Sequence, residues 1–310
     1  MQQRNTFVAA VLGLALLATA CGADDGAGTR GGEASSSGSL ADQDLSGGTE
    51  NPLVLDAVSE YETYVAAQVD ELIILTRTFT DAVRAGDLAA AQAGFAPSRE
   101  PWERIEPVAG LIEDIDGAVD ARVDDFASVA DPEFTGWHRL EYLLFERQTT
   151  EGGSPFADQL DADLARLQRE LPGLEVPPTA VAIGAAELIE EVSQGKITGE
   201  EDRYSKTDLW DFGANVEGAQ VVIDELRPAL ARADPELLAE IDGGFAALTT
   251  SLAPLRQGDG WVLYCQQDDP FPSSRCAGVT VDGATVDRLK ADLASLSEDL
   301  ALVAGALGLR

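Results

Sequence analysis

The segment 135–146, TGWHRLEYLLFE, contains the only histidine of the 310-residue chain, His138, three residues before Glu141. Residues three apart lie on the same face of a helix, so the imidazole and the carboxylate can reach a common centre. A neutral imidazole nitrogen and a carboxylate oxygen are ligands for divalent metal ions. The pair alone has a second interpretation, because acidic residues are frequent in this chain and a single histidine is often a core or surface residue.

A second pair with the same spacing lies upstream, in the segment SREPWERIEPVAG. Glu103 and Glu106 share one face of a predicted helix, and the other face presents Trp102 and Ile105. Pro107 removes a backbone donor beside Glu106, which predicts a kink there. The alternative interpretation of this pair is a solvated acidic face.

Two further acidic segments could add ligands. The segment DIDGAVDARVDDF contains five aspartates, too many for all to be ligands, and GKITGEEDRYSKTDLWDFGAN offers Glu200, Glu201, Tyr204 and Asp208. Asp208 falls where a helix is expected to begin. Acidic residues also stabilise helix N-termini, so capping is an alternative role for Asp208.

Apolar residues at three- and four-residue spacing predict helices through most of the chain after residue 50. The first ends near Gly86, the second begins near Asp87, and a third follows Pro97. The later helices are expected at about 135–145, 160–171, 179–192, 207–231, 235–255 and 284–307. Since no run of alternating β-branched residues is long enough for a sheet, the predicted fold is all-α, with a pair of helical bundles in one continuous unit.

The N-terminal residues predict export. Residues 1–20 contain Arg4 and a short apolar run, which is typical of a signal peptide and too short to span a bilayer. The ATAC ending resembles a lipoprotein cleavage box and predicts that Cys21 becomes a lipidated N-terminus; ordinary secretion with a free Cys21 is the alternative. Residues 21–50 are rich in Gly, Ser and acid and form a predicted flexible tether, which leaves 51–310 as the helical domain.

The net charge limits the possible partners, and the two remaining cysteines predict a covalent link. The formal charge of −34 repels nucleic acid and favours cations, although an acidic surface also simply keeps proteins soluble. Cys265 and Cys276 lie in one irregular stretch of a chain that is predicted to be exported. A disulfide between them is the expected state and two free thiols the alternative.

Four segments, ERIEPVAG, DIDGAVDARVDDF, TGWHRLEYLLFE and GKITGEEDRYSKTDLWDFGAN, resemble in this order the motifs of imelysin-like proteins, most closely the EfeO/EfeM branch. The resemblance covers nearly all of residues 52–310. It implies an extracytoplasmic fold of two four-helix bundles that serves an Efe iron-uptake system beside an EfeU-type permease and an EfeB-type haem peroxidase. EfeO forms have an N-terminal cupredoxin domain, for which the tether leaves no room, so the chain resembles the shorter EfeM type.

Carried over by motif, the family's metal centre implies six ligands, namely Glu103, Glu106, Asp120, His138, Glu141 and Glu201. Neighbouring aspartates are alternatives to Asp120, and Glu200 is an alternative to Glu201. The family commonly reads YSHTDL, whereas this chain has Lys206 in place of the histidine. A cation there argues against a second metal position at that turn.

This donor set predicts the bound metal and the pH dependence of binding. One imidazole with several carboxylates suits ferric or ferrous iron, and zinc, manganese or copper could also bind. Because His138 must be neutral to bind a metal, the affinity is expected to weaken below about pH 6.5. A metal-binding protein that is not an enzyme is the favoured function. A zinc metallopeptidase is the alternative, although helical zinc hydrolases show HExxH and this chain has a single histidine.

Overall fold

The structure is a computed structural model that describes residue 45 and residues 48–309. The predicted signal peptide, the lipidation site Cys21 and most of the predicted tether lie outside the described residues. None of the described helices combines the length and the apolar character that crossing a bilayer requires.

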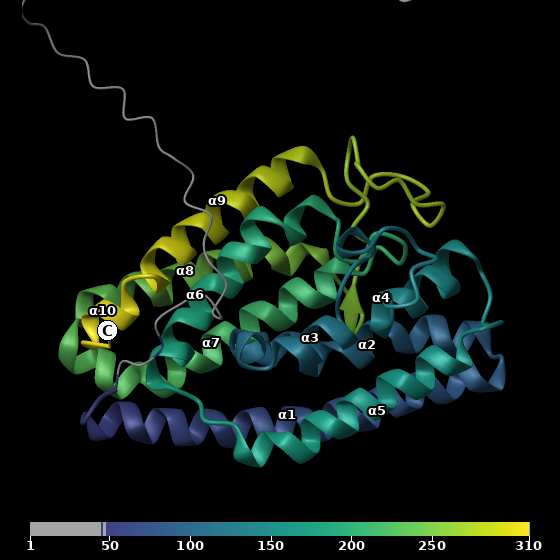
Figure 1. Cartoon of the computed structure of the whole chain (residues 1–310). Helices are drawn as coiled ribbons and strands as arrows, with labels where there is room; N and C mark the ends of the chain where they lie inside the picture. The colour runs from purple at the N-terminus through teal and green to yellow at the C-terminus, as the bar shows by residue number, and fades with distance from the viewer. Residues whose placement is uncertain (1–44, 46–47, 310) are drawn as a thin grey trace, which may run out of the picture. The chain divides into compact units, whose positions relative to one another are not determined.

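The described residues form an all-α fold, which confirms the predicted fold class (Figure 1). The α-helices are α1 (Pro52–Ala85), α2 (Leu88–Ile105), α3 (Glu113–Val119), α4 (Gly136–Glu141), α5 (Ser154–Glu170), α6 (Pro178–Gln194), α7 (Asp208–Ala233), α8 (Pro235–Leu252), α9 (Gly283–Leu300) and α10 (Val303–Ala306). Short 3-10 turns η2 (Glu106–Leu111), η3 (Val123–Asp125), η5 (Leu171–Gly173), η6 (Lys196–Thr198) and η7 (Ala253–Leu255) and the π-helical turn η4 (Tyr142–Glu146) join them.

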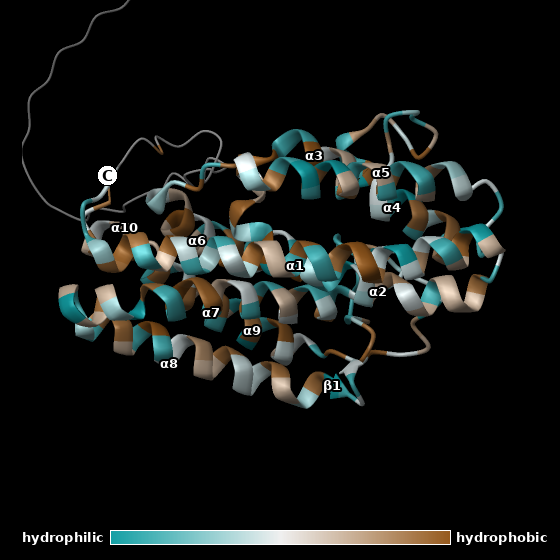
Figure 2. Ribbon diagram, turned by 90° about the horizontal axis from the view of Figure 1, so that it is seen from below, coloured by the Kyte–Doolittle hydropathy of each residue, from teal (hydrophilic) through white to brown (hydrophobic). Residues whose placement is uncertain are grey.

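The helices pack in two groups. Helices α1, α2 and α5 pack together with the short α3 and α4, and α6, α7, α8 and α9 form the other group (Figure 1). Helix α7 also packs against α1 and α2, so a single hydrophobic core runs through both groups. Figure 2 shows hydrophobic and hydrophilic residues along most helices, as amphipathic packing requires.

Helix α1 follows directly from its sequence. The Asn51 side chain accepts a hydrogen bond from the Leu53 backbone at 3.1 Å, and Pro52 occupies the first helical position. Eleven residues of the helix are buried, at the three- and four-residue spacing of one stripe. The helix ends at Ala85, before Gly86, as predicted.

The predicted break at Pro97 is wrong, because α2 continues through Pro97 and Pro101 to Ile105. Each proline removes one helical hydrogen bond, but side chains supply others. The Ser98 hydroxyl donates to the Phe95 carbonyl at 2.7 Å, and Thr76 of α1 donates to the Ser98 carbonyl at 3.3 Å. Neither bond reaches the carbonyls that the two prolines leave without a donor, so the packing of α2 against α1 and α7 is what keeps the helix continuous. This turn of α2 positions the first candidate ligands.

The only strands among the described residues are the two-residue β1 (Arg256–Gln257) and β2 (Gly260–Trp261), paired antiparallel. The segment after them is closed by a disulfide between Cys265 and Cys276, whose Cα atoms are 5.6 Å apart. The Tyr264 hydroxyl donates to the Ile197 carbonyl of η6 at 2.9 Å. This segment is thereby attached to the turn that follows α6.

Candidate metal centre

The centre is built around His138 on α4. Gly136 opens this helix at φ +73°, and a Cβ there would lie 2.1 Å from the Val119 carbonyl oxygen, so only glycine allows this approach to the end of α3. The approach brings His138 beside Asp120, the residue that follows α3. His138 Nε2 lies 3.4 Å from Asp120 Oδ1 and 3.6 Å from Glu201 Oε1.

Among the described residues, three groups place candidate ligand atoms within 4.8 Å of one another. They are Asp120, His138 and Glu201; His138, Glu141 and Asp202; and Glu103, Glu201 and Asp211. We name the first group the triad. It joins three of the six predicted ligands, from segments that are 18 to 81 residues apart in the chain.

Glu141 lies on the opposite side of the His138 imidazole from Asp120 and Glu201. Its Oε2 is 3.2 Å from His138 Nδ1, and its Oε1 accepts hydrogen bonds from the Tyr204 and Ser205 backbones at 2.9 and 2.7 Å. When the imidazole is neutral, Nδ1 donates to Glu141, and the lone pair of Nε2 faces Asp120 and Glu201. This is the way in which metal-ligating histidines are oriented in other sites.

The chain also places a cation in the centre that was not predicted. The side chain of Arg99 is fully buried, and its Nη1 hydrogen-bonds to Asp120 and lies 3.2 Å from His138 Nε2. Its Nη2 contacts Glu103 and lies 3.0 Å from Glu201 Oε1. Arg99 therefore offsets part of the negative charge of Asp120, Glu201 and Glu103.

A second buried cation holds the two upstream glutamates. Lys196 Nζ, from η6, is 2.9 Å from Glu103 Oε2 and 2.8 Å from Glu106 Oε2. Asn215 of α7 donates to the same two oxygens at 3.0 and 2.7 Å. Glu103 and Glu106 thus converge on the centre, but a lysine and an amide already satisfy them.

The other acidic candidates, and Lys206, make contacts outside the triad. Asp114 and Asp124 form ion pairs with Arg166 and Arg203 near the surface. Asp208 is the first residue of α7 and accepts from the Asp202 backbone at 3.3 Å, while the N-cap residue Thr207 makes no side-chain capping bond. Lys206, in place of the family histidine, is buried and 2.8 Å from Asp269 of the disulfide-closed segment.

The electrostatics of the triad depend on these contacts. Burial and the Arg99 guanidinium lower the pKa of His138, but hydrogen bonds to three carboxylates outweigh them and raise it well above its ordinary value. Burial raises the pKa of Asp120, but Arg99 and His138 lower it more, so the net shift is downward. The triad without a metal thus pairs a carboxylate that is ionised with an imidazole that holds its proton.

This proton changes the expected pH dependence of metal binding. A metal ion must displace the proton of His138, so below the raised pKa the affinity should fall by up to about tenfold per pH unit, and above it the affinity should level off. We therefore expect the loss to begin well above pH 6.5. Calorimetry with Mn²⁺ at pH 7, in two buffers of different ionisation enthalpy, should show about one proton released per ion. A flat affinity between pH 6 and 8 without proton release would contradict this.

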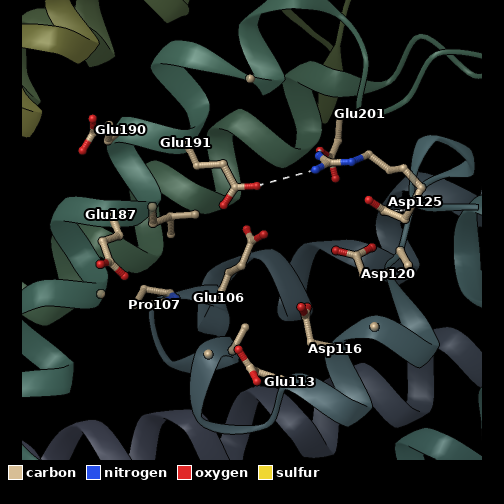
Figure 3. A pocket seen from close by; sticks show the side chains of 18 of the residues that line it. Glu106, Pro107, Glu113, Asp116, Asp120, Asp125, Glu187, Glu190, Glu191 and Glu201 are labelled. Atoms are coloured by element: carbon tan, nitrogen blue, oxygen red, sulfur yellow. Dashed lines mark hydrogen bonds and ion pairs between the residues drawn. The ribbon is translucent and has the colours of Figure 1, made fainter. Parts of the chain in front are cut away.

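An acidic pocket of about 760 Å³ borders the triad. Figure 3 shows the carboxylates of Glu106, Asp116 and Glu191 directed into a common space, and Asp120 and Glu201 line it as well. The pocket is further lined by Glu113, Asp125, Glu187, Glu190 and the single arginine Arg122, which contacts Glu201. Burial raises the pKa of Asp116 to about 7. Two of the three triad residues therefore line a cavity that attracts cations.

Comparison with known proteins gives one consistent family. The imelysin family model, which is designated peptidase family M75, matches residues 57–300. The chain is 48% identical over 254 residues to proteins named "Iron uptake system component EfeO" from Escherichia coli O157:H7, Escherichia coli K12 and Shigella flexneri. The match covers 82% of this chain and 64% of each of these relatives, so the chain spans less than two thirds of their length.

Proposed function

The chain belongs to the imelysin family, and we propose that it binds iron outside the cytoplasm as a component of an iron uptake system. The observation that supports this most directly is the convergence of Asp120, His138 and Glu201 beside an acidic pocket. Two carboxylates and one imidazole form a hard donor set that suits ferrous and ferric iron and also accepts manganese or zinc. The names of the relatives support iron as the cargo.

In this proposal the pocket guides the ion to the triad. Its nine carboxylates attract a hydrated cation and repel anionic chelates, and Asp120 and Glu201 belong to both the pocket and the triad. Glu141 holds the imidazole so that Nε2 faces the ion. Anchoring through Cys21 would keep the protein at the membrane, where it delivers iron to a permease that works beside a haem peroxidase.

A comparison of two adjacent glutamates tests the binding site. Glu201→Gln should weaken Fe²⁺ binding, measured anaerobically, by about 100-fold, because it removes a buried charged ligand of the triad. Glu200→Gln is the matched control. Its side chain is 33% exposed and 4.0 Å from Arg122, so its affinity should stay within about twofold of the parent. Equal affinities for the two variants would remove the triad as the site.

The peptidase designation of the family suggests a second function, zinc-dependent hydrolysis. Catalytic zinc commonly has three protein ligands and an open position for water. The triad offers three ligands, but only one of them is an imidazole, and the two histidines of an HExxH helix cannot be present because the chain contains a single histidine. We propose that the protein is not a peptidase. Chelator-sensitive cleavage of casein by the zinc-loaded protein would overturn this.

A further inference from the structure

The guanidinium of Arg99 and a metal ion compete for the same three atoms. A metal bound to the triad would lie about 2.1 Å from each donor, hence between them. Arg99 already contacts each of these residues, with Nη1 at Asp120 and at His138 Nε2 and with Nη2 at Glu201. Two positive charges at this separation in a buried site repel strongly. Arg99 therefore cannot keep these contacts once a metal is bound.

Two buried carboxylates beside Arg99 provide a second position for the guanidinium. Asp202 Oδ1 and both oxygens of Asp211 are buried and make no hydrogen bond to any described residue, and the same is true of Arg99 Nε. Arg99 Nε is 3.5 Å from Asp211 Oδ1 and 3.9 Å from Asp202 Oδ1. Buried carboxylate oxygens without hydrogen bonds are costly, so partners for them in another state are expected.

We propose that iron binding is a cation exchange, in which Arg99 leaves the triad and moves its guanidinium to Asp202 and Asp211. Arg99 then determines the affinity without being a ligand. In the metal-free protein it pairs with buried carboxylates, which are strongly unfavourable when they have no partner. Because Arg99 competes with the ion for the triad, it lowers the affinity and favours release of the ion. A protein that passes on its cargo requires such release. The proposal rests on the proposed function.

Two substitutions should change the affinity in opposite directions. Arg99→Met removes the competing cation, so it should tighten Mn²⁺ and Fe²⁺ binding by at least about tenfold and make the melting temperature depend strongly on added metal. Asp211→Asn weakens the second position of the guanidinium, so it should loosen binding by about tenfold. Arg227→Met is the control, because Arg227 is a partly exposed residue of α7 that pairs with Asp224 of the same helix and with Asp242 of α8. Its affinity should match the parent.

A double variant separates the exchange from simple coordination by Asp211. If Asp211 only receives Arg99, Asp211→Asn should have no effect in the Arg99→Met background; if Asp211 is a ligand, the loss should persist, and the exchange is wrong. Should Arg99→Met not fold, a parental affinity for Asp211→Asn overturns the exchange. Weaker binding by Arg99→Met also overturns it. A parent protein that binds no iron contradicts the proposed function instead, because the exchange is measured with Mn²⁺ as well.

Discussion

Replacing His138 with alanine should weaken Fe²⁺ binding by more than about 100-fold. His138 offers the only nitrogen donor of the triad, it is 2% exposed, and the chain contains no other histidine that could replace it. The loss in affinity should exceed the 10- to 100-fold loss that is usual when a residue that hydrogen-bonds to a metal ligand is removed. Competition with a chelator of known affinity, under anaerobic conditions, measures the difference. The proton released at pH 7 should also disappear in this variant.

Glu141→Gln is the matched comparison for His138→Ala. The amide keeps the shape of the side chain and can still accept from the Tyr204 and Ser205 backbones. It loses the negative charge beside His138 Nδ1, so the expected loss is smaller, about 10-fold. If Glu141→Gln lost as much as His138→Ala, Glu141 would be a ligand, and the group of His138, Glu141 and Asp202 would replace the triad.

The helices were largely predictable because their signals are local. The caps of α1 at Asn51 and of α8 at Asp234 and the buried stripe of α1 are present in short stretches of sequence. The break predicted at Pro97 was wrong, because α2 is held by its packing against α1 and α7, which lie elsewhere in the sequence. The split at Leu300 between α9 and α10 was also missed, since apolar residues continue through it.

The centre was only partly predictable, for a related reason. Spacing and family resemblance indicated His138 and the acidic residues of the centre as candidate ligands, because these residue types commonly bind metal ions. Arg99 precedes Glu103 by four residues, which on a solvated helix would be an ordinary surface ion pair. Its burial, and that of Lys196, follows from the packing of α2 against α7 and from the position of η6. No local signal in the sequence distinguishes these two cations from exposed ones.

Gly184→Ala should destabilise the fold by about 3 kcal/mol and lower the melting temperature by roughly 6 to 12 °C. A Cβ at Gly184, on α6, would lie 1.7 Å from the carbonyl oxygen of Pro107 in η2. The obstacle is backbone rather than a flexible side chain, so α6 and η2 must separate. Pro107 directly follows Glu106, and this separation should therefore also pull Glu106 away from Lys196. Thermal unfolding and Mn²⁺ titration measure the two effects.

Gly243→Ala is the control for this substitution, because Gly243 is an exposed residue of α8 and its added Cβ would have nothing within 4 Å. There the alanine should stabilise the helix by about 0.5 to 1 kcal/mol, since it lowers the entropy of the unfolded chain. A Gly184→Ala protein as stable as the parent would mean that η2 can move freely against α6. The position of Glu106 in the centre would then not depend on this contact, and Lys196 and Asn215 alone would hold it.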